Sequence, residues 1–339
     1  MNLVNLKNNY SFDIMRGMIV LCSLMAFVCG RALAQSGHNL QSTRFMVVGY
    51  TRNHINLLAE VKKFQLEKLT HLNIAFLNPD SAGKFSTPTD LKKVCRYAHK
   101  KHVQVLLSIA GGAPPKYLSG MLAGDKQEVL ISSLLKMVVD NKVDGIDVDL
   151  EGRMIDSNYE SFVIHLGVAL KAKQKLMTAA IATYYAKRYT DRALAQFDFV
   201  NEMSYDKTGP WDMDKPGQHA PYDMAVQDLD YWTIERGIPK AKLNLGLPFY
   251  GYGFGKDAPT DMAYKNIVNK YPDAADTDQV SVSSGGTIYY NGALTIKKKT
   301  KLAISKAGGV MMWQLLQDAE GDLSLLKVVS DEIELMSQQ

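Results

Sequence analysis

Four carboxylic acids fall within eight residues of an otherwise apolar segment, at Asp144, Asp147, Asp149 and Glu151. Side chains alternate between the two faces of a β-strand, so the last three share one face and Asp144 points the other way. Asp149 and Glu151 are then about 6 to 7 Å apart along the strand. Like charges at this range oppose full ionisation, and a retained proton is what a general acid needs. The segment predicts acid catalysis, with Asp144 as a structural residue.

Two other interpretations of the acidic segment are a metal site and a solvent-exposed edge strand. Hard cations usually take ligands from flexible loops with added water, and an exposed edge strand would not carry an apolar reverse face. That face is formed here by Ile146, Val148 and Leu150 and suits packing against helices. Catalysis fits the residues better than either alternative, and we expect no metal ion in the site.

Short apolar and β-branched runs recur along the chain, with amphipathic helical patterns such as residues 91–101 and 126–141 between them. This alternation predicts parallel strands joined by helices. Eight such units favour a (β/α)8 TIM barrel, whose active site lies at the carboxyl ends of the strands. The strand candidates are residues 45–50, 71–77, 103–109, 145–150, 176–182, 199–205, 243–248 and 309–315.

A doubly wound open sheet would alternate in the same way. It would more often place a glycine-rich turn after the first strand, whereas here Tyr50 is followed by Thr-Arg-Asn. One gap, residues 251–295, is too long for a structureless loop and contains a strand pattern at residues 287–290. We therefore expect a small inserted subdomain between strand 7 and helix 7, next to the active site.

The N-terminus has the features of a secretory signal peptide. Arg16 precedes an apolar stretch at residues 18–28, which is too short to span a bilayer, and Ala-Leu-Ala at residues 32–34 is a pattern that signal peptidase cuts. A buried N-terminal helix is the alternative. We expect a signal peptide at residues 1–34, a catalytic barrel at residues 35–339, and export to the periplasm or the extracellular space.

The composition is that of a globular protein with a large core, since 46% of the 339 residues are hydrophobic. The 39 basic and 35 acidic residues give a net charge of +4, too near balance for a nucleic-acid partner. One basic run, from Lys297 to Lys301, is interpreted as the solvent-facing side of a helix. No membrane span is expected, and we expect the chain to act as a monomer.

The acidic segment resembles the DxxDxDxE signature of glycoside hydrolase family 18, which contains the chitinases and the endo-β-N-acetylglucosaminidases. Further family motifs occur in the expected order, and the resemblance extends over almost all of the chain after residue 34. These motifs are Ser-Ile-Ala-Gly-Gly at residues 108–112, which is similar to SxGG, MxYD at residues 203–206, and the runs LPFYG, YYNG and MW at residues 247–251, 289–292 and 312–313.

The resemblance implies a role for each residue of the acidic face. Glu151 would protonate the glycosidic oxygen and later activate water. The substrate's own acetamido oxygen, rather than an enzyme carboxylate, would attack the anomeric carbon to give an oxazolinium intermediate. Asp149 would orient the acetamido group, and Asp147 would share a proton with Asp149. Tyr205 would donate a hydrogen bond to the acetamido carbonyl. No metal or organic cofactor is implied.

The resemblance also implies a set of substrate-binding residues. Trp313 would be the floor on which the sugar stacks, and Asp206 would help to hold the sugar. Tyr50 and Phe76 end the first two strands and are expected in the wall of the site, and Met203 would border it. Ser108 is also a candidate, although the alternative is that it shapes the strand and its carboxylates; Trp313 and Phe76 could likewise be barrel core.

Departures from the family pattern narrow the range of expected substrates. Gly152 follows the glutamate where tyrosine is common, and Ala113 follows the glycine pair where tryptophan is frequent. With few aromatic platforms, soluble chitooligosaccharides or other N-acetylglucosamine-containing glycans are favoured over crystalline chitin. Three hypotheses follow: a chitinase-like hydrolase, an endo-β-N-acetylglucosaminidase acting on the chitobiose core of N-glycans, and a non-catalytic sugar-binding relative. Retention of Glu151 argues against the third.

Overall fold

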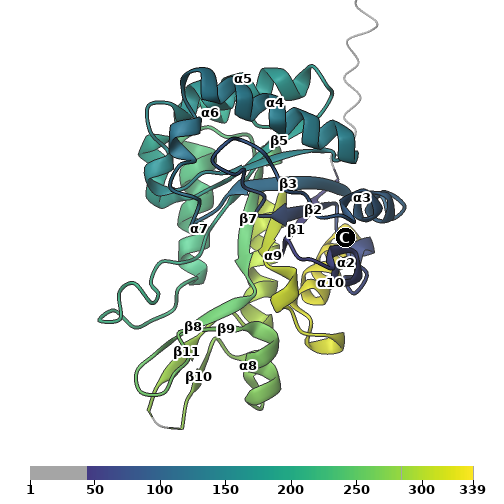
Figure 1. Cartoon of the computed structure of the whole chain (residues 1–339). Helices are drawn as coiled ribbons and strands as arrows, with labels where there is room; N and C mark the ends of the chain where they lie inside the picture. Colours follow the sequence, from purple (N-terminus) through teal and green to yellow (C-terminus); the bar gives the residue numbers. More distant parts are fainter. Residues whose placement is uncertain (1–43, 284, 339) are drawn as a thin grey trace, which may run out of the picture. The chain divides into compact units, whose positions relative to one another are not determined.

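The computed structural model describes residues 44–283 and 285–338. The predicted signal peptide lies outside these residues. Eight parallel strands form a closed barrel in which the last strand pairs with the first (Figure 1). This confirms the predicted (β/α)8 fold. The barrel strands are β1 (Met46–Arg52), β2 (His71–Ala75), β3 (Gln104–Ala110), β4 (Gly145–Asp149), β5 (Leu176–Ile181), β6 (Phe199–Glu202), β7 (Leu243–Pro248) and β12 (Gly309–Trp313).

Helices cover the outside of the barrel (Figure 1), because the outward face of each strand is apolar. Ile146 and Val148 of β4 are fully buried in this outer core, on the face opposite the carboxylates. The alternation predicted for the acidic segment is therefore present. The helices are α2 (Leu57–Val61), α3 (Leu91–His99), α4 (Gly124–Asn141), α5 (Tyr159–Lys171), α6 (Asp191–Leu194), α7 (Tyr222–Asp230), α9 (Ala293–Lys306) and α10 (Leu325–Ser337).

A second sheet is inserted between β7 and α9, as predicted. Its first strand follows β7 almost directly, so it begins at the carboxyl end of the barrel (Figure 1). The sheet is antiparallel, with the order β10, β11, β8, β9. It consists of β8 (Tyr250–Phe254), β9 (Asp261–Ala263), β10 (Gln279–Ser281) and β11 (Thr287–Tyr289), with the helix α8 (Tyr264–Lys270).

The basic run on α9 does not face solvent throughout, and the prediction is wrong for Lys299. Lys299 shares a helix face with Ile296 and Ala303, and all three are fully buried. Its Nζ donates a 2.8 Å hydrogen bond to the carbonyl of Ala220, and burial lowers its pKa to about 7. Because Lys299 is three residues after Ile296 and four before Ala303, it lies on the helix face that packs against the protein core.

Among the residues that the structure describes, no helix is long and apolar enough to cross a membrane.

Candidate active site

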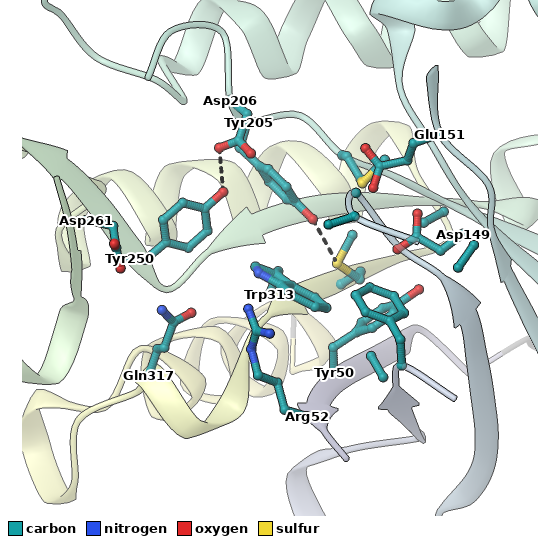
Figure 2. Close-up of a pocket in the computed structure, with 18 of the residues that line it drawn as sticks. Tyr50, Arg52, Asp149, Glu151, Tyr205, Asp206, Tyr250, Asp261, Trp313 and Gln317 are labelled. Atoms are coloured by element: carbon teal, nitrogen blue, oxygen red, sulfur yellow. Dashed lines mark hydrogen bonds between the residues drawn. The ribbon is translucent and has the colours of Figure 1, made fainter. Parts of the chain in front are cut away.

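A cleft of about 780 Å³ opens at the carboxyl ends of the barrel strands (Figure 2). It brings together side chains from β1, β2, β4, β12 and the segment after β6, which are far apart in the sequence. Eight of the ten predicted site residues line it: Tyr50, Phe76, Asp149, Glu151, Met203, Tyr205, Asp206 and Trp313. The other two, Asp147 and Ser108, are fully buried beneath it.

The acidic segment reaches the cleft because its backbone stays extended beyond the strand. Asp149 is the last residue of β4, and Glu151 keeps an extended conformation, with φ −116° and ψ 158°. Both side chains therefore point into the cleft, as Figure 2 shows. Asp144 lies on the other side of the chain and accepts 2.7 Å bonds from the Val105 amide and from His99, a structural role.

Asp147 is held by three hydroxyl groups. Tyr50 and Ser108 each lie 2.7 Å from Oδ2, and Thr178 lies 2.6 Å from Oδ1. Strand register explains two of the three, since Ser108 of β3 and Thr178 of β5 are the direct cross-strand partners of Asp147. Burial raises the pKa of Asp147, and the hydrogen bonds act against that rise.

Asp149 and Glu151 differ from Asp147 in lacking such donors. Oδ1 of Asp149 is buried without a hydrogen-bond partner among the described residues. Burial, and then the negative charges of Glu151 and Asp147, hold the pKa of Asp149 well above its usual value. Burial, with the charge of Asp206, raises the pKa of Glu151 to about 7. Both shifts favour the protonated form, which a general acid requires.

Tyr205 and Asp206 follow β6 in a tight turn. The amides of Ser204 and Tyr205 bond back to carbonyls only two residues earlier, and Asp206 takes a left-handed conformation with φ 63°. The Tyr205 hydroxyl lies 3.8 Å from Sδ of Met311 (Figure 2). Asp206 Oδ1 accepts a 2.5 Å bond from the hydroxyl of Tyr250. The turn therefore brings a phenol and a carboxylate from adjacent residues into the same cleft.

Trp313 lies among aromatic rings at the end of β12. Phe76 stacks on it with ring centroids 5.5 Å apart, and Tyr50 contacts it at 5.7 Å. Close packing at Phe76 requires glycine at position 111, because a Cβ there would lie 2.3 Å from the Phe76 ring and the φ of Gly111 is +79°. The indole remains partly exposed in the cleft and offers an apolar surface to a sugar ring.

Several lining or supporting residues were not singled out as site residues from the sequence. Thr178 could have been found, because it is the polar residue on the inward face of an apolar strand. Tyr250 stands in the LPFYG run, and Trp211 is one of three tryptophans. Arg52, whose guanidinium lies 5.6 Å from the Trp313 ring, and Asp261 carry no motif and reach the cleft only through the fold.

Within the described part of the chain, no group of three or more His, Cys, Asp or Glu side chains is arranged to hold a metal ion.

A parallel barrel with a glutamate and an aspartate of raised pKa beside a partly exposed indole defines a carbohydrate-cleaving class of site. The chain matches the model of the family "Glycosyl hydrolases family 18" over residues 46–318. It belongs to that family and is a chitinase-like glycoside hydrolase. This confirms the resemblance found in the sequence motifs.

Solved structures of similar proteins include a GH18 chitinase, ChiB, from the chitin utilization locus of Flavobacterium johnsoniae. It is 35% identical, covers 87% of this chain and 95% of its own, and has a TM-score of 0.78. A chitinase from Bacteroides thetaiotaomicron is 30% identical, with a TM-score of 0.74 over 87% of this chain and 98% of its own. An endochitinase of Brugia malayi is 26% identical over 62% of this chain, which spans only 45% of that longer protein.

Proposed function

We propose that the protein hydrolyses β-1,4 bonds next to N-acetylglucosamine in chitin-derived oligosaccharides, with retention of configuration. The observation that carries this proposal is the pair Asp149 and Glu151, both with raised pKa values, in a cleft beside the Trp313 indole. The proposal gives these groups the roles that the family resemblance implies.

In the first step, Glu151 donates its proton to the glycosidic oxygen as the bond to the anomeric carbon breaks. The acetamido oxygen of the same sugar closes onto that carbon to form an oxazolinium ion. The nitrogen gains positive charge in this step, and the carboxyl group of Asp149 stabilises it. The hydroxyl of Tyr205 donates to the acetamido oxygen and orients it, while Trp313 supports the sugar ring.

In the second step, the Glu151 carboxylate takes a proton from a water molecule, and that water attacks the anomeric carbon. The oxazolinium ring opens, the acetamido group is restored, and Glu151 is protonated again. Two inversions at one carbon give net retention. Asp147, held by three hydroxyl donors, lies beneath Asp149 and shares a proton with it.

We further propose that residues 1–34 are a signal peptide, that residues 35–339 form the catalytic unit with its insertion at residues 251–295, and that the protein acts outside the cytoplasm as a monomer. Sequencing the N-terminus of the exported protein would test the cleavage after Ala34. Light scattering of the purified protein would give its mass in solution.

The deciding experiment offers purified protein a chitooligosaccharide series and, separately, a high-mannose glycopeptide, with products identified by mass. Cleavage of the oligosaccharides, with water incorporated at the retained anomer, is the expected result. Cleavage of the glycopeptide alone would replace the proposal with the endo-β-N-acetylglucosaminidase activity, and binding without turnover of either substrate would indicate a sugar-binding relative.

A further inference from the structure

A chain of hydrogen bonds between side chains crosses the inside of the barrel. Asn201 of β6 and Asn244 of β7 are direct cross-strand partners, and both side chains are fully buried. Nδ2 of Asn244 donates a 3.0 Å hydrogen bond to Oδ1 of Asn201, and Nδ2 of Asn201 donates a 3.1 Å bond to the hydroxyl of Tyr50. That hydroxyl donates in turn to Oδ2 of Asp147. The chain therefore runs from β7 through β6 and β1 to a carboxyl group of β4.

A glycine on β12 leaves room for the first amide of this chain. Gly309 is the cross-strand partner of Asn244, and a Cβ at position 309 would lie 2.4 Å from Oδ1 of Asn244. Carbon and oxygen atoms do not approach this closely, so a larger residue would displace the amide. Oδ1 of Asn244 has no hydrogen-bond partner among the described residues, whereas Nδ2 is bonded to Asn201. The position of the Asn244 amide thus depends on the space at Gly309 and on the bond to Asn201.

The direction of the chain follows from what each group can donate. An amide oxygen only accepts and an amide nitrogen only donates, whereas a phenol has one proton and can do both. Because Oδ1 of Asn201 accepts from Asn244, the nitrogen of Asn201 meets the hydroxyl oxygen of Tyr50. The hydroxyl accepts there, and its one proton is left for Asp147. Burial, and then the charges of Asp147 and Asp149, hold the pKa of Tyr50 well above its usual value, so the phenol keeps this proton.

We propose that Asn201 and Asn244 are positioning residues for the catalytic site, which act through Tyr50 by directing its proton onto Asp147. The inference rests on the proposed function and extends it to two residues that do not line the cleft. Their effect reaches the reaction through Asp147, the carboxyl group that shares a proton with Asp149 in the proposed mechanism.

Each amide has a separate part in this arrangement. The bond from Asn201 polarises the Tyr50 hydroxyl and strengthens the bond that Tyr50 donates, because hydrogen bonds in a chain reinforce one another. The bond from Asn244 fixes which end of the Asn201 amide faces Tyr50. Without Asn244, the amide of Asn201 is free to turn over, and its oxygen then competes with Asp147 for the Tyr50 proton. Loss of either amide therefore weakens the support of the Asp147 carboxylate.

A double-mutant cycle tests whether the amides act through the Tyr50 hydroxyl. The readout is kcat for chitotetraose in the wild type, Tyr50→Phe, Asn201→Leu and the double variant. We expect kcat to fall about tenfold in Tyr50→Phe, which loses a hydrogen bond to a carboxylate, and about threefold in Asn201→Leu. In the Tyr50→Phe background, Asn201→Leu should change kcat less than about twofold. Asn244→Leu should behave like Asn201→Leu in both backgrounds.

Asn291→Leu is the matched control, because it removes a buried amide that bonds to the Ala220 carbonyl and lies outside the chain. It should lower the free energy of unfolding and leave kcat unchanged. Losses that multiply to about thirtyfold in the double variant would indicate independent structural effects and overturn the proposal. No loss in Asn201→Leu, or an equal loss in Asn291→Leu, would also overturn it.

Neutron diffraction from a deuterated crystal of the wild type tests the direction of the chain without any turnover. We expect the Tyr50 deuteron to point at Oδ2 of Asp147, and a deuteron on Nδ2 of Asn201 to point at Tyr50. A Tyr50 deuteron that points at Asn201 would overturn the proposal, whether or not the variants fold. If the wild type turns over no chitotetraose, the proposed function fails, and the neutron structure alone decides whether the amides direct the Tyr50 proton.

Discussion

Thr178 offers a sensitive probe of how the buried carboxylate Asp147 is held. Oδ2 of Asp147 accepts hydrogen bonds from two hydroxyls, but Oδ1 accepts only that of Thr178, at 2.6 Å. Thr178→Val keeps the shape of the side chain and removes this donor. Because Asp147 is fully buried, no solvent can replace the lost bond, and Oδ1 is left without a partner.

The expected cost follows from the charge on the acceptor. A hydrogen bond to a charged group contributes roughly 1.5 to 3 kcal/mol, so the free energy of unfolding should fall by about 2 kcal/mol at pH 8. That corresponds to a fall in Tm of about 4 °C in a chain of this size. Thr178→Val should also raise the pKa of Asp147 above its already raised value, because the charged form loses a donor.

The stability deficit of Thr178→Val depends on pH because the pKa of Asp147 differs between the folded and the unfolded state. A carboxyl whose pKa is higher in the folded state favours folding at pH values below its unfolded pKa, about 3.9, and loses that contribution as the pH rises through the folded value. A further rise in the pKa of Asp147 in the variant enlarges the loss of folding stability at high pH. The deficit of Thr178→Val should therefore shrink to about 1 kcal/mol, the value of a neutral hydrogen bond, when Asp147 is protonated.

Urea unfolding at pH 4 and pH 8 measures the stability deficit with Asp147 protonated and with Asp147 ionised. Thr51→Val is the matched control, because the Thr51 hydroxyl is buried in β1 without a hydrogen-bond partner among the described residues. Its removal should not lower the free energy of unfolding, because a buried hydroxyl without a partner costs stability rather than contributing to it. A Thr178→Val deficit that is equal at both pH values, or no larger than that of Thr51→Val, would refute the proposed support of an ionised Asp147.

Further predictions concern the catalytic acid Glu151 and the expectation that the reaction needs no metal ion. Glu151→Gln should fold and bind oligosaccharide like the wild type but lose turnover by about 10²- to 10⁴-fold, the usual range for a general acid; near-full activity would show that another group donates the proton. Because the acid form of Glu151 is needed and its pKa is about 7, kcat/KM should fall as the pH rises through 7, and a rate that rises there would contradict the assignment. Addition of EDTA should leave the rate of chitooligosaccharide cleavage unchanged, and a large loss would indicate a metal requirement.

Side-chain alternation predicted the acidic face because residues 145–149 form a regular strand that is buried on both faces. Asp147, Asp149 and Glu151 do lie on the inward side, since the backbone stays extended through Glu151. The strand candidate at residues 199–205 also extends over Met203 and Tyr205, yet β6 ends at Glu202. Tight turns, rather than strand parity, place those two residues in the cleft. Their position depends on hydrogen bonds that a periodic pattern does not encode.

Contacts between strands could not be predicted from one sequence, because they depend on barrel register. Thr178 is a partner of Asp147 only because β5 pairs with β4 in that register. At Lys299 the prediction was wrong for another reason. The run of lysines predicted an exposed helix face, but helical spacing buries its middle member. Composition describes a segment as a whole, whereas packing acts on single positions.

The distribution of hydroxyl donors along β4 decides where its protons reside. Three carboxyl groups in a row cannot all be ionised, and burial alone would raise the pKa of each. Hydroxyls from β1, β3 and β5 converge on Asp147, so negative charge is most stable at the deepest position. Asp149 has no such donor, and burial with the charges of Glu151 and Asp147 holds its pKa well above the usual value, while burial and the charge of Asp206 raise the pKa of Glu151 to about 7. The barrel thus acts on the proton content of the cleft largely from beneath, through the buried Ser108 and Thr178 together with Tyr50 of the cleft wall.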